Sequence, residues 1–189
     1  MRLGAQRILL ISVLALFAGY LVQTLFTSMQ ENNNDSERRD RQSPVDGSPR
    51  EPFSTKLLNL EGKEVTVQDV MEGETVVLNF WATWCPPCLR EIPTFIKLQS
   101  KYREHGISFL GVALDDISEV SAFLEEMKLN YPVLIGDQQV IKMMEGLGNS
   151  IGALPYTVVL NRERNTIYSH QGEWLEGPAD EFLGRQIVK

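Results

Sequence analysis

The only two cysteines of the chain, Cys85 and Cys88, form a Cys-x-x-Cys motif. A thiolate attacks disulfides, and two thiols three residues apart can close a disulfide between themselves. Two cysteines cannot build a framework of several disulfides or a four-cysteine zinc site. A bond that only braces the fold is a poor explanation, because so short a loop gains little from chain entropy. The pair therefore predicts thiol–disulfide exchange.

The elements around the motif place these thiols at the start of a helix. The apolar, β-rich run Thr75–Trp81 is typical of a buried strand, and apolar residues at helical spacing follow the motif. Free N–H groups and the helix dipole would stabilise a thiolate on Cys85. We expect Cys85 to be the nucleophile and Cys88 the more buried, resolving thiol. Because Pro86 and Pro87 lack an N–H, Cys85 loses a possible donor, which favours a stronger reductant.

A metal site is the other chemistry that two thiolates allow. Together with His105 or His170, the pair would offer ligands for copper or zinc. Both histidines are distant in sequence from the cysteines, so a surface or core role is the usual expectation for each. A thiol-based copper or apoprotein-binding chaperone is therefore the alternative from another functional class. We expect no cofactor.

Hydrophobic periodicity predicts an α/β fold over residues 53–189. A hairpin turning at residues 61–63 comes first, before the central strand. The elements expected after residue 106 are strands at 107–114, 131–135, 155–161 and 166–170, and helices at 118–128, 138–145 and 178–188, with Ser118 and Pro178 at the starts of the first and last helix. This order predicts a mixed sheet covered by helices on its faces.

The first 52 residues predict a membrane-targeting segment followed by a flexible linker. Residues 8–26 carry no charge and would span roughly 28 Å as a helix, close to the hydrocarbon thickness of a bilayer. Arg2 and Arg7 precede them, so residues 1–7 are expected in the cytoplasm and the remainder outside. A cleaved signal peptide is the alternative, although the run is long for one. Residues 27–52 are polar and contain three prolines, which is typical of a flexible linker.

These features predict a single-pass protein of a bacterial cytoplasmic membrane. Its catalytic domain, residues 53–189, would face the periplasm or extracytoplasmic space. The formal net charge of the whole chain is −7. Nucleic acid is not an expected partner, because binding phosphates requires clustered lysine and arginine.

The sequence resembles the thioredoxin superfamily, in particular its TlpA/ResA/CcmG-like branch. The residues that carry the likeness are 79–88 (NFWATWCPPC), Glu91, Pro93, 152–157 (GALPYT) and Gly172. The resemblance covers about residues 53–189. It implies a thioredoxin fold with an N-terminal β-hairpin and a central helix–strand insertion, which residues 115–144 would supply.

The resemblance also implies a surface that binds substrate. Pro155 matches the family's cis-proline, which faces the disulfide in the fold. Leu154, before it, would offer backbone atoms to an extended substrate segment. Trp84, Pro86 and Pro87 are expected to complete this surface around the cysteines.

An acidic residue of the branch is matched by Glu91, one helical turn beyond Cys88. A half-buried carboxylate there would raise the pKa of the thiols and shuttle the proton for Cys88. A solvated glutamate on the helix surface is the alternative. Asn79 stands where cytosolic thioredoxins carry a buried aspartate, and asparagine cannot take a proton. This departure gives Glu91 more weight.

The predicted function is that of a protein disulfide oxidoreductase. It would reduce disulfides of exported proteins, apocytochrome c among them, with the dithiol Cys85 and Cys88. Because the outer compartment is oxidising, the resemblance implies a membrane electron donor of the DsbD/CcdA type. An oxidase or isomerase of secreted proteins is the alternative within the same chemistry.

Overall fold

The computed structural model describes residues 51–187. The predicted membrane segment at residues 8–26, the preceding residues 1–7 and the linker as far as residue 50 lie outside this range. Within it, no helix combines the length and apolarity needed to cross a membrane. The first element, the 3-10 helix η1 (Glu51–Ser54), begins in the last two residues of the predicted linker.

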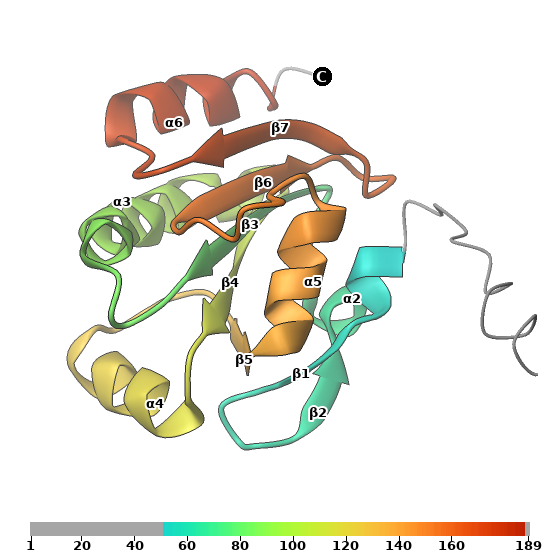
Figure 1. Cartoon of the computed structure of the whole chain (residues 1–189). Helices are drawn as coiled ribbons and strands as arrows, with labels where there is room; N and C mark the ends of the chain where they lie inside the picture. Colours follow the sequence, from blue (N-terminus) through green and yellow to red (C-terminus); the bar gives the residue numbers. More distant parts are fainter. Residues whose placement is uncertain (1–50, 188–189) are drawn as a thin grey trace, which may run out of the picture. The chain divides into compact units, whose positions relative to one another are not determined.

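Seven strands of the described residues form one sheet in the order β2-β1-β5-β4-β3-β6-β7 (Figure 1). Their bounds are β1 Lys56–Leu58, β2 Glu64–Thr66, β3 Thr75–Trp81, β4 Ile107–Leu114, β5 Val133–Gly136, β6 Tyr156–Leu160 and β7 Thr166–Gln171. β3, β4 and β5 are parallel, and the strands on either side of them pair antiparallel. The expected mixed sheet is confirmed.

Helices cover both faces of this sheet (Figure 1). They are α2 Val67–Val70, α3 Pro86–Tyr102, α4 Ile117–Glu126, α5 Gln138–Gly146 and α6 Glu176–Gly184, with the 3-10 helix η2 Arg103–His105 after α3. α2 and α5 pack on one face in a single apolar cluster. α3, α4 and α6 pack on the other face in two clusters.

The central strand β3 sends alternate side chains to the two faces. Val76 and Phe80 belong to the cluster with α5, whereas Val77 and Trp81 belong to the two clusters on the α3 side. Asn79 lies between Val77 and Trp81 in this alternation. It therefore faces α3, at the level where the two clusters meet.

The predicted elements match the structure with a few differences. β3 and β4 have the expected bounds, β1 and β2 form the expected hairpin, and α4 with β5 supplies the expected helix–strand insertion. The residue before α4 is Asp116 rather than the expected cap Ser118, and α6 begins two residues before Pro178. The short helix α2 was not predicted, because four residues show no periodicity.

Gly73, two residues before β3, lies where the backbone conformation and the close packing both require glycine. Its φ is +79°, and a Cβ there would lie 2.7 Å from the carbonyl oxygen of Gly106. Gly73→Ala should lower the free energy of unfolding by about 1–3 kcal/mol. Gly177→Ala in α6 is the control, since its Cβ would meet nothing within 4 Å. Urea unfolding measures both, and equal losses would contradict this account.

Candidate active site

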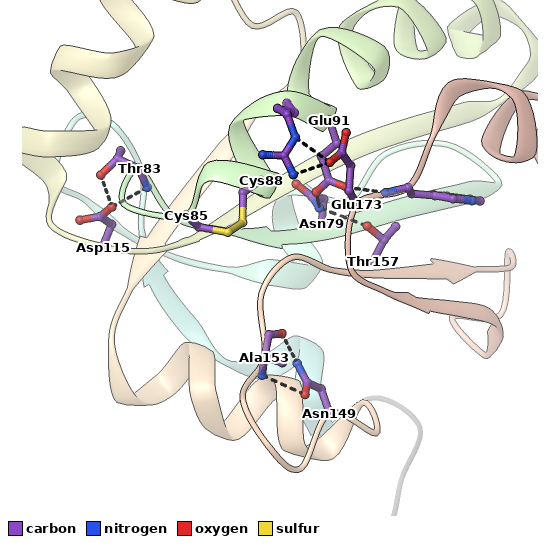
Figure 2. The surroundings of a disulfide bond; sticks show 12 residues. Asn79, Thr83, Cys85, Cys88, Glu91, Asp115, Asn149, Ala153, Thr157 and Glu173 are labelled. Atoms are coloured by element: carbon purple, nitrogen blue, oxygen red, sulfur yellow. Dashed lines mark hydrogen bonds and ion pairs between the residues drawn. A yellow bond between two sulfur atoms is a disulfide. The ribbon is translucent and has the colours of Figure 1, made fainter.

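The two cysteines form a disulfide where β3 passes into α3 (Figure 2). Cys85 caps the N-terminus of α3, and the two Cα atoms are 5.3 Å apart. Cys85 is 5% exposed, whereas Cys88 is fully buried. Cys85 is therefore the more exposed of the two residues, although both are buried.

Two prolines shape the first turn of this helix. Pro86 and Pro87 are its first two residues, so Cys88 is the first helical residue with a backbone N–H. The carbonyl of Cys85 accepts a hydrogen bond from the N–H of Leu89 at 3.2 Å. A sulfur at the N-terminus thus meets fewer backbone donors than in a helix without prolines.

The loop before β6 lies against the cysteines. The Leu154–Pro155 peptide bond is cis, as the resemblance implies. Leu154 packs against the apolar cluster that contains both cysteines. The side chain of Asn149 closes this loop, because its Nδ2 donates to the carbonyl of Ala153 at 2.8 Å and its Oδ1 accepts from the Ala153 N–H at 3.3 Å (Figure 2).

The remaining residues expected at the substrate surface lie next to Cys85 in the chain. Trp84 is 63% exposed, although its ring is large and apolar. Pro86 is exposed and Pro87 is half-buried. A large apolar ring is thus exposed to solvent at the residue next to Cys85 in the chain.

Glu91 is buried, with 1% of its surface exposed. Its Oε1 accepts a hydrogen bond from Asn79 Nδ2 at 2.8 Å, and its Oε2 accepts from the backbone N–H of Trp174 at 3.0 Å. Burial raises the pKa of Glu91 to about 7, against the opposing effect of these two donors, and the charge of Glu173 adds to the rise. A carboxyl with this pKa can take and release a proton near neutral pH.

Asn79 links Glu91 to the opposite strand. Its Nδ2 also donates to Thr157 Oγ1 at 3.1 Å (Figure 2). Asn79 and Thr157 are direct partners in the antiparallel register of β3 and β6. Three polar side chains thus form one buried group on the α3 side of the sheet.

The Trp174 N–H is held in place by the packing of its own ring. The indole is 1% exposed and meets Phe95 edge-on. Ion pairs between α3 and the segment around Trp174 also hold this segment in place: Arg90 with Glu173, Lys97 with Glu176, and Lys101 with Asp180. Exposed pairs contribute about 0–1 kcal/mol each, whereas a fully buried large apolar side chain contributes about 1.5–3 kcal/mol. The ring is therefore the main anchor.

A second carboxylate secures the turn that carries the cysteines. Asp115 Oδ2 accepts hydrogen bonds from the Thr83 N–H at 2.8 Å and from Thr83 Oγ1 at 2.6 Å (Figure 2). Asp115 directly follows β4, and Thr83 follows the neighbouring parallel strand β3. The turn leading to Cys85 is thereby tied to the adjacent strand end.

The histidines lie elsewhere. His105 ends η2, beyond the C-terminus of α3, whereas Cys85 caps the other end of this helix. His170 on β7 stacks with Trp174 and Tyr168. In residues 51–187 no three histidine, cysteine, aspartate or glutamate side chains come together in a way that could hold a metal ion.

The fold and the cysteine pair define a thioredoxin-like protein disulfide oxidoreductase. The Redoxin family model matches residues 46–182, and the chain belongs to this family. Thiol-disulfide oxidoreductase ResA of Halalkalibacterium halodurans is 32% identical over 134 residues, which cover 70% of this chain and 72% of that protein. These findings confirm the predicted superfamily, branch and enzyme class.

Solved structures show the same fold. A thioredoxin-related protein from Neisseria meningitidis serogroup B matches with a TM-score of 0.61 and 26% identity, covering 70% of this chain and 99% of that one. A thiol:disulfide interchange protein of the thioredoxin family from Chlorobium tepidum TLS has a TM-score of 0.60 and 24% identity, covering 70% and 92%.

Sequence reasoning missed several residues of this site. Asp115 was open to prediction, because ends of parallel strands meet at one edge of a sheet. Thr157 required the register of β3 and β6, which the sequence does not reveal. Trp174 contributes its backbone N–H, and the role of a backbone group cannot be predicted from the residue type.

The raised pKa of Glu91 predicts a pH-dependent stability. Because the folded pKa lies above the unfolded value of 4.5, the contribution of Glu91 is complete below about pH 4.5 and is lost as the pH rises through about 7. Relative to Glu91→Gln, the oxidised protein should lose about 3 kcal/mol between about pH 4 and pH 8. Urea unfolding at both pH values measures this.

Glu125→Gln is the matched control, since Glu125 is exposed on α4. Its pH dependence should follow that of the wild type. A wild-type curve parallel to that of Glu91→Gln would contradict the raised pKa.

Removing the carboxylate of Asp115 should loosen the turn before Cys85. We expect Asp115→Ala to lower the free energy of unfolding by about 1–3 kcal/mol and to slow disulfide exchange by roughly tenfold. Asp116→Ala is the control, because its exposed side chain makes no capping hydrogen bond. Similar rates for the two variants would show that this tie does not position Cys85.

Proposed function

We propose that the protein reduces disulfides of exported proteins, with apocytochrome c as the first substrate class to examine. The observation that carries this proposal is the arrangement along α3: Cys85 at its N-terminus, the fully buried Cys88 one turn below it and a buried carboxyl of pKa about 7 one turn further. This arrangement supplies a nucleophile, a resolving thiol and a proton carrier in chain order.

In the proposed reaction the thiolate of Cys85 attacks one sulfur of a substrate disulfide. A mixed disulfide forms, and the other substrate sulfur leaves as a thiolate. Cys88 then gives its proton to Glu91 and attacks the sulfur of Cys85. The second substrate thiolate leaves, and the enzyme is left with the Cys85–Cys88 disulfide. Two electrons pass to the substrate, which also takes up two protons.

Pro86 and Pro87 support the direction of this reaction. Neither supplies an N–H to a thiolate on Cys85, so the reduced form is less stabilised than in a helix that keeps these donors. A less stable reduced form is the stronger reductant. The buried carboxylate of Glu91 adds to this effect, because a nearby negative charge disfavours a thiolate.

Substrate would bind as an extended segment across Cys85. Leu154, before the cis bond, packs on the cysteine cluster and would pair its backbone with the substrate. Trp84, next to Cys85 in the chain, offers an exposed apolar ring. This mode of binding selects for an unfolded or extended chain, which suits exported proteins that have not yet folded.

The proposed setting is the outer face of a bacterial cytoplasmic membrane. Residues 8–26 would anchor the chain, and residues 27–52 would let the catalytic domain reach its partners. In an oxidising compartment the spent disulfide needs electrons from elsewhere. We therefore include a membrane electron donor of the DsbD/CcdA type in the proposal, and the anchor would keep the domain near it.

The equilibrium reduction potential tests the direction. We expect a value near about −270 mV, as in thioredoxin. Equilibration with glutathione or dithiothreitol buffers, followed by thiol alkylation, measures it. A value near about −120 mV, as in DsbA, would overturn the reductase proposal and make the protein an oxidant of secreted thiols.

A further inference from the structure

One buried polar atom of the site is left without a hydrogen bond. Among the side chains of residues 51–187, Asn79 Oδ1 is the buried nitrogen or oxygen atom that has no partner. The nitrogen of the same amide serves two neighbours, Glu91 and Thr157. Folded proteins leave few such atoms, and each one calls for an explanation. Here the orphaned atom belongs to the side chain that contacts the buried carboxyl.

This orientation of the amide fits an ionised Glu91. A carboxylate only accepts hydrogen bonds. Its Oε1 accepts from Asn79 Nδ2, and its Oε2 accepts from the Trp174 N–H. The hydroxyl of Thr157 then acts as an acceptor for the second N–H of Asn79.

A Glu91 that is protonated on Oε1 favours the opposite orientation of the amide. A proton on Oε1 would face the N–H of Asn79, so that two donors meet. Turning the amide over about its last side-chain bond brings Oδ1 to this position instead. Oδ1 can then accept from Glu91, and it can also accept from Thr157, because a hydroxyl is both donor and acceptor. In either orientation Glu91 and Thr157 keep a partner in Asn79, and the unpartnered position is taken by Oδ1 in one and by the NH₂ group in the other.

We propose that Asn79 is a positioning residue whose side-chain amide reverses when Glu91 gains or loses its proton. Thr157 is the matching hydroxyl, held opposite Asn79 by the register of β3 and β6. The orphaned oxygen is the acceptor that the protonated state uses. The role of this reversal in disulfide exchange rests on the proposed function of Glu91 as proton carrier for Cys88.

Few charged groups near Glu91 compete with this amide. Glu173, in the connection from β7 to α6, acts on it through its charge and is itself paired with Arg90. Tyr131, before β5, is buried, and burial raises its pKa, so it stays neutral. Cys88 lies one turn earlier on α3. The hydrogen bonds to the carboxyl come from Asn79 and from the Trp174 backbone.

The side-chain NH₂ group of Asn79 gives a direct test by NMR. The sample is the full-length chain in detergent, with ¹⁵N-labelled asparagine, and the resonance is assigned by its loss in Asn79→Leu. Above about pH 7 we expect nuclear Overhauser contacts from these protons to Glu91 and Thr157. Below about pH 7 the contacts should weaken. The midpoint of this change should equal the midpoint of the pH titration of the Glu91 carboxyl ¹³C chemical shift. Unchanged contacts from about pH 5 to about pH 9 would overturn the proposal.

The acid dissociation constant of Glu91 gives a second test in Asn79→Leu. An amide that can serve both states has a smaller net effect on the constant than a fixed donor, so the constant should change by less than about threefold. A fixed donor stabilises only the carboxylate, and its removal would lower the constant by more than about tenfold. That larger change would overturn the proposal. Gln99→Leu, which removes another buried amide on α3, is the control and should leave the constant unchanged.

These tests are separate from the test of the proposed function. If Glu91→Gln exchanged disulfides at the wild-type rate, Glu91 would not be the proton carrier. The reversal of the Asn79 amide would still be decided by the contacts and the dissociation constant, which need no turnover.

Discussion

A carboxyl group buried without a cation is the constraint on which the site depends. Of the charged side chains in the described range, only that of Glu91 is buried, and it has no lysine or arginine partner there. Burial of an unpaired carboxylate is costly, and the group responds by holding its proton up to a higher pH. The fold therefore keeps one exchangeable proton on the helix that carries Cys88.

The rest of the structure holds the few groups that make this burial tolerable. β3 directs Asn79 toward α3, and β6 sets Thr157 opposite it. The indole of Trp174 is buried against Phe95 and so fixes a backbone N–H at the carboxyl. These groups come from strands and connections far apart in sequence, so the proton site forms only when β3, β6, α3 and the connection after β7 have come together.

Much of the fold could be read from the sequence, and the reason is local. β3 and β4 are continuous apolar runs, and the apolar residues of α3 recur at helical spacing, so each element follows from its own residues. Cys85 and Cys88 were found in the same way, because their spacing carries the chemistry. Glu91 and Pro155 needed a family resemblance, since a glutamate on a helix and a proline before a strand are common in other roles. The contacts of Asn79 with Thr157, and of Thr83 with Asp115, depend on strand pairing, which no local pattern contains.

The two prolines at the start of α3 also have a mechanical consequence. Each fixes φ near −65°, and the flanking turn is tied to Asp115 through Thr83. The backbone between the cysteines therefore has little freedom to move when the disulfide opens or closes. A partner that distinguishes the oxidised enzyme from the reduced one would then have to respond to the sulfur atoms themselves.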